Sequence, residues 1–300
     1  MEKKGRIVTR KVDRKKAVGL RLADFIKLDK NEVNHFDFKN MSPSFEVQKE
    51  LHPVKKFILY KKDYQERLLN RVKEKFDCDR CELVLEIYSK IYSNKDLNNL
   101  DLDTMNSFYQ TYRLLLLSND KSFWENDFKT FCNDRGVKPK TIKYNALKLL
   151  RYEWLLSEKV FNHYEDINNH PDVMRFATVT HTLGNMTLLP KGFNVGRAIA
   201  TRDYWDLTLM SLQSFLDRSF DAFVTDYYME DFIDDKLELW EGHCFEYPLP
   251  NSFNKKEART LSEIEKNSII QSRIFEFMKN VNGKIENRSE RLYKALIVKL

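Results

Sequence analysis

Three histidines and several asparagines lie close together between residues 162 and 194. His163, His170 and His181 fall within 19 residues, and Asn185 and Asn194 follow them. A neutral imidazole can bind a divalent metal or accept a proton, and an asparagine can orient a second histidine. The pattern therefore predicts a site that uses Mg²⁺ or another divalent ion. Its candidate metal ligands are His163 and His170, and its candidate catalytic residues are His170, His181, Asn185 and Asn194.

The same residues are also typical of a structural loop that is rich in turns. Asparagine is common in caps and turns, and a histidine next to a proline, as in His170-Pro171, is most often structural. A second motif, Cys78-x-x-Cys81, supplies only half of the four ligands that a structural zinc ion needs, and the other two cysteines are isolated in the sequence. Both interpretations of the histidine and asparagine cluster stay open at the level of sequence.

The composition indicates a helical protein with an aromatic core. Apolar residues make up 42% of the chain and aromatic residues 13%, with only 8 Gly and 7 Pro, which argues against disorder and against a β sandwich with many turns. We expect Asn119 or Asp120 to cap a helix that ends at Gly136 in a left-handed turn. Helical spacing of apolar residues predicts helices over 63–76, 82–92, 104–117, 139–163, 203–220 and 221–234.

A small two-stranded turn module is predicted inside this helical body. Residues 177–180 and 186–189 are rich in β-prone side chains, and the Leu-Gly-Asn sequence at 183–185 is typical of a turn between them. The expected fold is therefore α+β and predominantly α-helical, with the two-stranded turn module near 177–190.

The chain is predicted to have three parts. Residues 1–57 form a basic, extended N-terminal region, because polar residues and prolines leave little room for a long helix. Residues 58–250 form a helical core domain that includes the turn module at 177–197. Residues 251–300 form C-terminal helices, with a capping box at Thr260-x-x-Glu263 and a break at Gly283.

Charge is distributed unevenly along the chain. Residues 1–30 carry +7 and residues 251–300 carry +5, so residues 31–250 carry −6 within a total of +6, and ten acidic residues lie within 217–246. The basic N-terminal arm could contact the phosphates of DNA or RNA, or it could dock on this acidic segment of its own chain. The candidate nucleic-acid-binding residues of the arm are Lys3, Lys4, Arg6, Arg10, Lys11, Arg14, Lys15 and Lys16.

The sequence contains no candidate for a membrane span. The longest unbroken apolar runs, at 114–117 and 295–298, are far shorter than the about 18 residues that a span needs. The first residues are basic but lack the apolar segment of a secretory signal. We therefore expect a cytoplasmic protein with no membrane partner, in which the four cysteines are reduced.

The segment 181–194, His-Thr-Leu-Gly-Asn-Met-Thr-Leu-Leu-Pro-Lys-Gly-Phe-Asn, resembles the signature of the HNH-like domain in GmrSD-type bacterial restriction proteins. The resemblance implies a metal-dependent endonuclease that acts in defence against foreign DNA, such as that of a phage. In that family an upstream Glu-His-x-x-Pro element at a strand end supplies the metal ligand and general base, and this sequence has no equivalent of it. The matching positions are Leu183, Gly184, Asn185, Thr187, Leu188 and Asn194.

A longer resemblance covers residues 36–250 and is to an uncharacterised bacterial family of unknown function. The shared order of motifs indicates a single domain and implies no activity. The motifs are Phe36-Asp37-Phe38, the turn Thr182-Leu183-Gly184 with Leu189-Pro190, the helical Asp206-Leu207-Thr208-Leu209, and the segment from Met229 to Asp235.

Two functions of different classes stay open. The first is a nucleic-acid-associated bacterial protein, either a metal-dependent HNH-like nuclease or a degenerate relative of one. The second is a non-enzymatic interaction or structural protein, whose acidic surface at 217–246 meets a protein partner. Convergence of the histidines and asparagines in an open cleft would favour the enzyme, whereas their burial in separate environments would favour a structural role.

Overall fold

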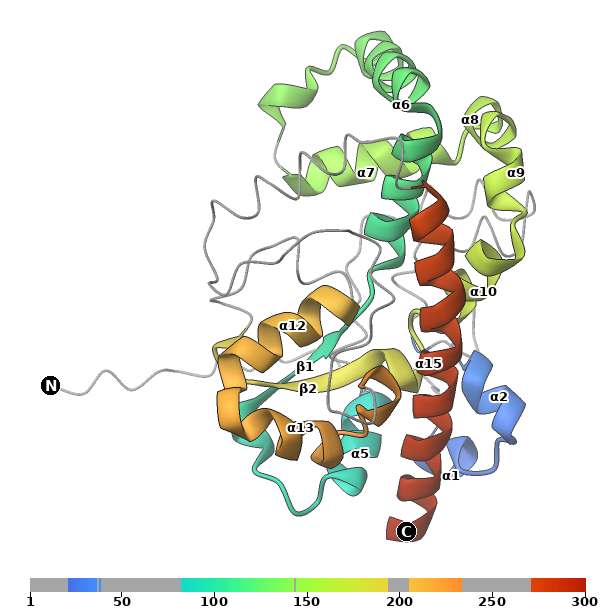
Figure 1. Ribbon diagram of the computed structural model, residues 1–300. Coiled ribbons are helices and arrows are strands. Elements are labelled where there is room, and N and C mark those ends of the chain that lie inside the picture. The colour runs from blue at the N-terminus through green and yellow to red at the C-terminus, as the bar shows by residue number, and fades with distance from the viewer. Residues whose placement is uncertain (1–20, 37, 39–81, 143, 194–204, 234–270) are drawn as a thin grey trace, which may run out of the picture.

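The computed structural model describes residues 21–36, 38, 82–142, 144–193, 205–233 and 271–300. These residues form a mainly helical body with a two-stranded antiparallel sheet, which confirms the expected α+β, predominantly helical class (Figure 1). Their buried apolar side chains form one connected core. The helix predicted at 63–76, the capping box at Thr260 and the basic arm lie outside the described residues.

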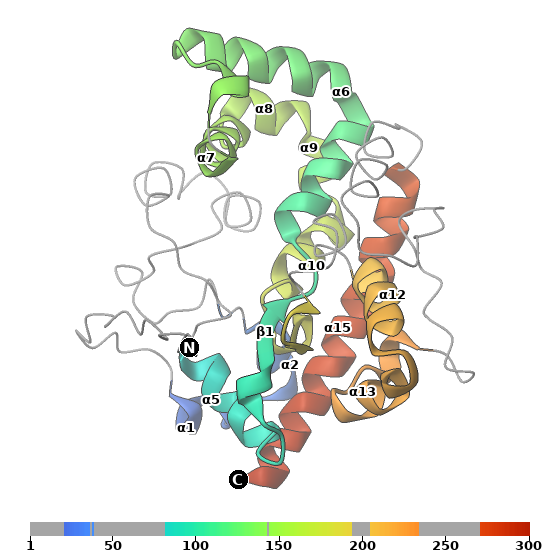
Figure 2. The ribbon, with the colours of Figure 1, turned by 90° about the vertical axis from the view of Figure 1, so that its left-hand side faces the viewer.

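The C-terminal helix α15 (Gln271–Lys299) is the central element of this body. At 1.5 Å per residue it is about 43 Å long. It contacts several other described elements (Figures 1 and 2), which are α2 (Lys30–His35), α5 (Glu82–Ile91), α6 (Phe108–Asp134), α10 (Pro171–Val179), η5 (Leu183–Asn185) and η8 (Glu230–Phe232). The predicted break at Gly283 is wrong, because the helix continues through this residue. Val281 and Ile285 on either side are buried at helical spacing, so packing of this face outweighs the about 1 kcal/mol that glycine costs inside a helix.

The sheet pairs β1 (Leu100–Thr104) with β2 (Met186–Pro190), and Leu102 lies opposite Leu188. The sequence predicts a local hairpin of 177–180 with 186–189. The strand at 186–189 is present as β2, whereas the predicted strand at 177–180 is wrong. Residues 177–179 belong to helix α10 (Pro171–Val179), which begins with Pro171 in its first turn and His170 as its N-cap.

Tertiary packing explains the helical state of 177–179. Val173, Phe176 and Ala177 of α10 are fully buried at helical spacing, and α10 packs along α15. The β-branched Thr178 and Val179 favour a strand only by local propensity, which is a weaker determinant than this packing.

Helix α6 (Phe108–Asp134) contains the capping residue that the sequence predicts. Asp120 has non-helical backbone angles (φ −145°, ψ 86°), and its carboxylate accepts a hydrogen bond from the Phe123 N–H at 2.8 Å. Asp120 therefore kinks α6 and caps its second half. Gly136 follows the helix with φ +64°, which confirms the predicted left-handed turn.

Several other long helices of the prediction are interrupted. The expected helix 139–163 is split into η4, α7 and α8, and Asp217, with φ +46°, separates the helix predicted at 203–220 into two. The bounds are α5 (Glu82–Ile91), η3 (Leu97–Asn99), η4 (Pro139–Thr141), α7 (Tyr144–Leu155), α8 (Glu158–His163), α9 (Glu165–Asn168), η5 (Leu183–Asn185), α12 (Trp205–Leu216), η7 (Asp217–Ser219), α13 (Phe220–Asp226) and η8 (Glu230–Phe232).

The N-terminal region is not extended where the structure describes it. It forms α1 (Leu22–Phe25) and α2 (Lys30–His35). Asp29 and Glu32 make a reciprocal capping box at the start of α2, with both hydrogen bonds at 2.8 Å. This Asp-x-x-Glu spacing is a helix-start signal that the composition of the region conceals. Among the described helices, none combines the length and apolarity that crossing a membrane requires.

Candidate functional site

The LGN segment, residues 182–187, links α10 to β2 and lies directly against α15. Gly184 donates its N–H to the Ser289 hydroxyl at 2.7 Å. A Cβ atom at Gly184 would lie 1.9 Å from the Ile285 carbonyl oxygen, far inside van der Waals contact. Glycine is therefore required at this position because the two backbones approach so closely.

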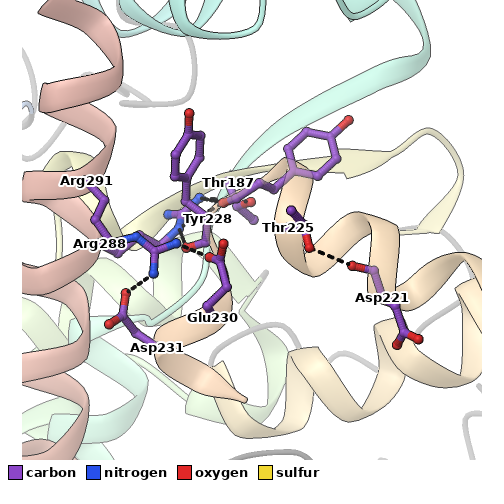
Figure 3. Close-up of polar contacts among 9 residues, drawn as sticks. Thr187, Asp221, Thr225, Tyr228, Glu230, Asp231, Arg288 and Arg291 are labelled. Carbon is purple, nitrogen blue, oxygen red and sulfur yellow. Dashed lines mark hydrogen bonds and ion pairs between the residues drawn. The ribbon is translucent and has the colours of Figure 1, made fainter. Parts of the chain in front are cut away.

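Arg288 of α15 is fully buried and also binds the LGN segment (Figure 3). Its Nη1 donates to the carbonyl of Gly184 at 2.8 Å and also to that of Met186, and its Nη2 reaches the Thr187 hydroxyl at 3.4 Å. A buried guanidinium is tolerated only when its donors are satisfied. Arg288 therefore ties the start of β2 to the middle of α15.

The same guanidinium also holds the turn that follows α13. The carbonyl of Tyr227 accepts from Nη2 at 3.0 Å, and that of Tyr228 accepts from Nε at 3.1 Å. Tyr228 adopts φ +59°, which is uncommon for a residue other than glycine. One side chain thus joins three segments, and the sequence prediction did not include it. The sequence holds one indication of this role. Arg288 is a charged residue at helical spacing between the apolar Ile285 and Leu292.

Asn185 makes a reciprocal contact with Asn106, directly after β1. Its Oδ1 accepts from the backbone N–H of Asn106 at 3.1 Å and from the side-chain amide at 3.0 Å. Its Nδ2 donates to the carbonyls of Asn106 and Thr180. Because Asn185 is fully buried, this predicted catalytic residue joins the end of α10 to the end of β1 and reaches no open cleft.

The three histidines of the cluster lie in separate environments. His163 stacks on Phe123 with ring centroids 3.5 Å apart, and its Nε2 is 3.1 Å from Asp120. His170 caps α10 by accepting the Asp172 N–H at Nδ1, whereas His181 is buried and its carbonyl accepts the Phe38 N–H at 3.0 Å.

The structure does not bring these histidines together, and Asn194 lies outside the described residues. In the part of the chain that the structure describes, no group of three or more His, Cys, Asp or Glu side chains could hold a metal ion.

The strand that pairs with the LGN segment also lacks the upstream element of HNH-like domains. β1 pairs with β2 along its length, and the chain leaves β1 through Met105 and Asn106. The run 100–106 reads Leu-Asp-Leu-Asp-Thr-Met-Asn and contains no histidine. No general base of the expected type therefore stands at this strand end.

Three of the five acidic residues that the structure describes in 217–246, namely Asp226, Glu230 and Asp231, pair with basic residues of the body, whereas Asp217 and Asp221 are exposed. Arg291 of α15 pairs with Glu230 and, at 3.1 Å, with Asp231 (Figure 3). Lys95 pairs with Asp226. Burial raises the pKa of Asp231, and Arg291 opposes this shift. This part of the segment therefore docks on the basic end of α15.

Comparisons of the chain with models of protein families, with curated proteins and with solved structures found no match.

Proposed function

We propose that this chain is a nucleic-acid-associated protein that does not cleave its ligand, a degenerate relative of HNH-like nucleases. The observation that carries this proposal is the use of the polar groups in the LGN segment. The N–H of Gly184, the side-chain amide of Asn185 and the hydroxyl of Thr187 all bind other parts of the protein, and all three residues are fully buried.

A catalytic asparagine or histidine must reach a substrate or a metal that contacts the substrate. Asn185 satisfies its amide on Asn106 and Thr180, and its loss would leave buried partners unpaired. The segment that resembles the HNH signature is therefore assigned a structural role, in which it ties the start of β2 to α15 and to the end of β1.

The charge distribution favours nucleic acid over a protein partner on the acidic segment. Asp226, Glu230 and Asp231 already pair with Lys95 and Arg291, which leaves this part of the acidic segment less negative charge to offer a protein partner. The +7 charge of residues 1–30 suits phosphate groups, which dominate nucleic-acid affinity.

The test is a titration of labelled duplex DNA and single-stranded RNA with the full chain, in EDTA and in Mg²⁺ or Mn²⁺. We expect binding that weakens steeply with salt, and intact nucleic acid in every sample. Absence of binding at low salt would refute the association. Metal-dependent cleavage that is lost in Asn194→Ala would instead establish the nuclease.

A further inference from the structure

A strongly basic segment spans the end of α6 and the start of α7. It lies within residues 31–250, whose net charge is negative. Residues 129–151, here called the basic corner, contain seven lysines and arginines and a single acidic residue, Asp134, which gives a net charge of +6. The basic residues are Lys129, Arg135, Lys138, Lys140, Lys143, Lys148 and Arg151. This segment alone carries a charge equal to that of the whole chain.

The basic corner lies at one end of the molecule, away from β1 and β2, in both views (Figures 1 and 2). Lys129, Lys138 and Lys140 are exposed, and none of them forms an ion pair with any residue that the structure describes. Lys159 of α8, by contrast, pairs with Asp127. The three lysines of the corner therefore present uncompensated positive charge to solvent.

Two further groups add positive potential behind these lysines. The Nε of Arg151 is buried and has no hydrogen-bond partner among the described residues, and its guanidinium lies 5.8 Å from the ring centre of Phe128. Helix α7 begins at Tyr144 with no acidic residue in its first turn. Helix N-termini carry a partial positive charge that stabilises anions, and no carboxylate in the first turn of α7 offsets it.

The corner is also held in a fixed conformation. Trp154 of α7 packs edge-on against Trp124 of α6, with ring centroids 4.8 Å apart, and its Nε1 donates to Asp127 at 3.2 Å. The turn after α6 is closed by the Val137 N–H, which donates to the Cys132 carbonyl at 2.9 Å. The backbone that carries the lysines is therefore held in place, and the conformational freedom lost on binding a ligand is that of the lysine side chains.

From this charge and geometry we infer that the basic corner is a contact surface for the phosphodiester backbone of a nucleic acid. The inference rests on the proposed function and adds a surface to it that the basic N-terminal arm does not include. The recognised chemistry is a row of phosphates, which duplex DNA and RNA share. Lysine contacts of this kind position the ligand without reading its sequence.

The test compares two triple variants of the full chain with equal charge. The corner variant carries Lys129→Gln, Lys138→Gln and Lys140→Gln. The control variant carries the same change at three exposed lysines of α15, which are Lys279, Lys294 and Lys299. Both variants lose three positive charges, so long-range electrostatics change equally and only the position differs. Matching far-UV circular dichroism and thermal midpoints establish that both fold.

Affinity for duplex DNA and for single-stranded RNA is measured over a range of salt concentrations. We expect the corner variant to bind duplex DNA about tenfold or more weakly at low salt, with a log–log salt slope shallower by about 0.9 for each lost phosphate contact. The control variant should keep the slope of the wild-type protein. The corresponding loss per contact for single-stranded RNA is about 0.7. The nucleic acid whose affinity falls more in the corner variant is the one that the corner prefers.

The two proposals fail in different ways. If the wild-type protein binds neither nucleic acid, the proposed function and this inference are both wrong. If the wild-type protein binds and the corner variant keeps its affinity and slope, only the inference is wrong. Equal losses in the corner and control variants would also overturn it, because they would reflect total charge rather than a surface.

Discussion

Replacement of Gly184 by alanine tests the close approach between the LGN segment and α15. The added Cβ would lie 1.9 Å from the Ile285 carbonyl oxygen, whereas ordinary contacts are 3.4 Å or longer. The two backbones would therefore have to separate by about 1.5 Å. The Gly184–Ser289 hydrogen bond is now 2.7 Å long and the Arg288–Gly184 hydrogen bond 2.8 Å. Such a shift would stretch both beyond hydrogen-bonding distance.

The magnitude follows from those two bonds and the misfit. A neutral hydrogen bond contributes about 1 kcal/mol and a bond to a charged group about 1.5–3 kcal/mol. Gly184→Ala should therefore lower the unfolding free energy by about 3–4 kcal/mol, a large part of the total of about 5–15 kcal/mol of a typical domain. Urea unfolding followed by circular dichroism measures this loss.

Gly283→Ala is the matched control in the same region. Gly283 lies inside α15, and no atom stands within 4 Å of the position of its added Cβ. Because glycine costs helix stability, this change should raise the unfolding free energy by about 0.5–1 kcal/mol. The reasoning is refuted if Gly184→Ala stays within about 0.5 kcal/mol of the wild-type protein.

Three further predictions concern the same contacts. Arg288→Met should lower the unfolding free energy by more than about 3 kcal/mol, because each buried carbonyl left unpaired costs about 1–3 kcal/mol. The control Arg291→Met removes a partly exposed ion pair and should lower it by less than about 1 kcal/mol. Equal losses of unfolding free energy in the two variants, measured in urea, would contradict the role assigned to Arg288. A double-mutant cycle of Asn106→Ala and Asn185→Ala should give a coupling of about 1–3 kcal/mol, whereas additive losses would show that the two amides act independently. Because burial raises the pKa of Asp231 above its ordinary 3.8, the folded state holds the proton more tightly than the unfolded state. The unfolding free energy should therefore fall as the pH rises from 3.8 through the pKa of the folded state. Asp231→Asn should remove this decline, and an unchanged pH profile of the unfolding free energy in that variant would count against the shift.

Local signals predicted the elements that depend on local physics. The apolar spacing of α5, the cap at Asp120 and the left-handed Gly136 are each determined within a few residues, and the structure has all three. The predicted strand at 186–189 also exists as β2. Its partner was missed, because β1 lies more than 80 residues earlier and offers only the alternation of Leu-Asp-Leu-Asp.

The candidate site shows the same limit of sequence reasoning. His163, His170 and His181 are neighbours in the sequence, but their partners are Phe123, the start of α10 and the Phe38 N–H. The contacts that organise the segment come from α15, about a hundred residues later. A residue such as Arg288 gains its role only when the chain folds back, and spacing cannot predict that. Averaging charge over 31–250 likewise concealed the basic corner.

The central claim is that the LGN segment maintains the fold and does not act on a ligand. Asn185→Ala tests it most directly when unfolding free energy and nucleic-acid affinity are measured on the same preparation, at a temperature where the variant remains folded. The account predicts a stability loss of about 2 kcal/mol or more, from buried groups left unpaired, with unchanged affinity. Unchanged stability together with lost affinity, or with loss of a metal-dependent cleavage, would contradict it.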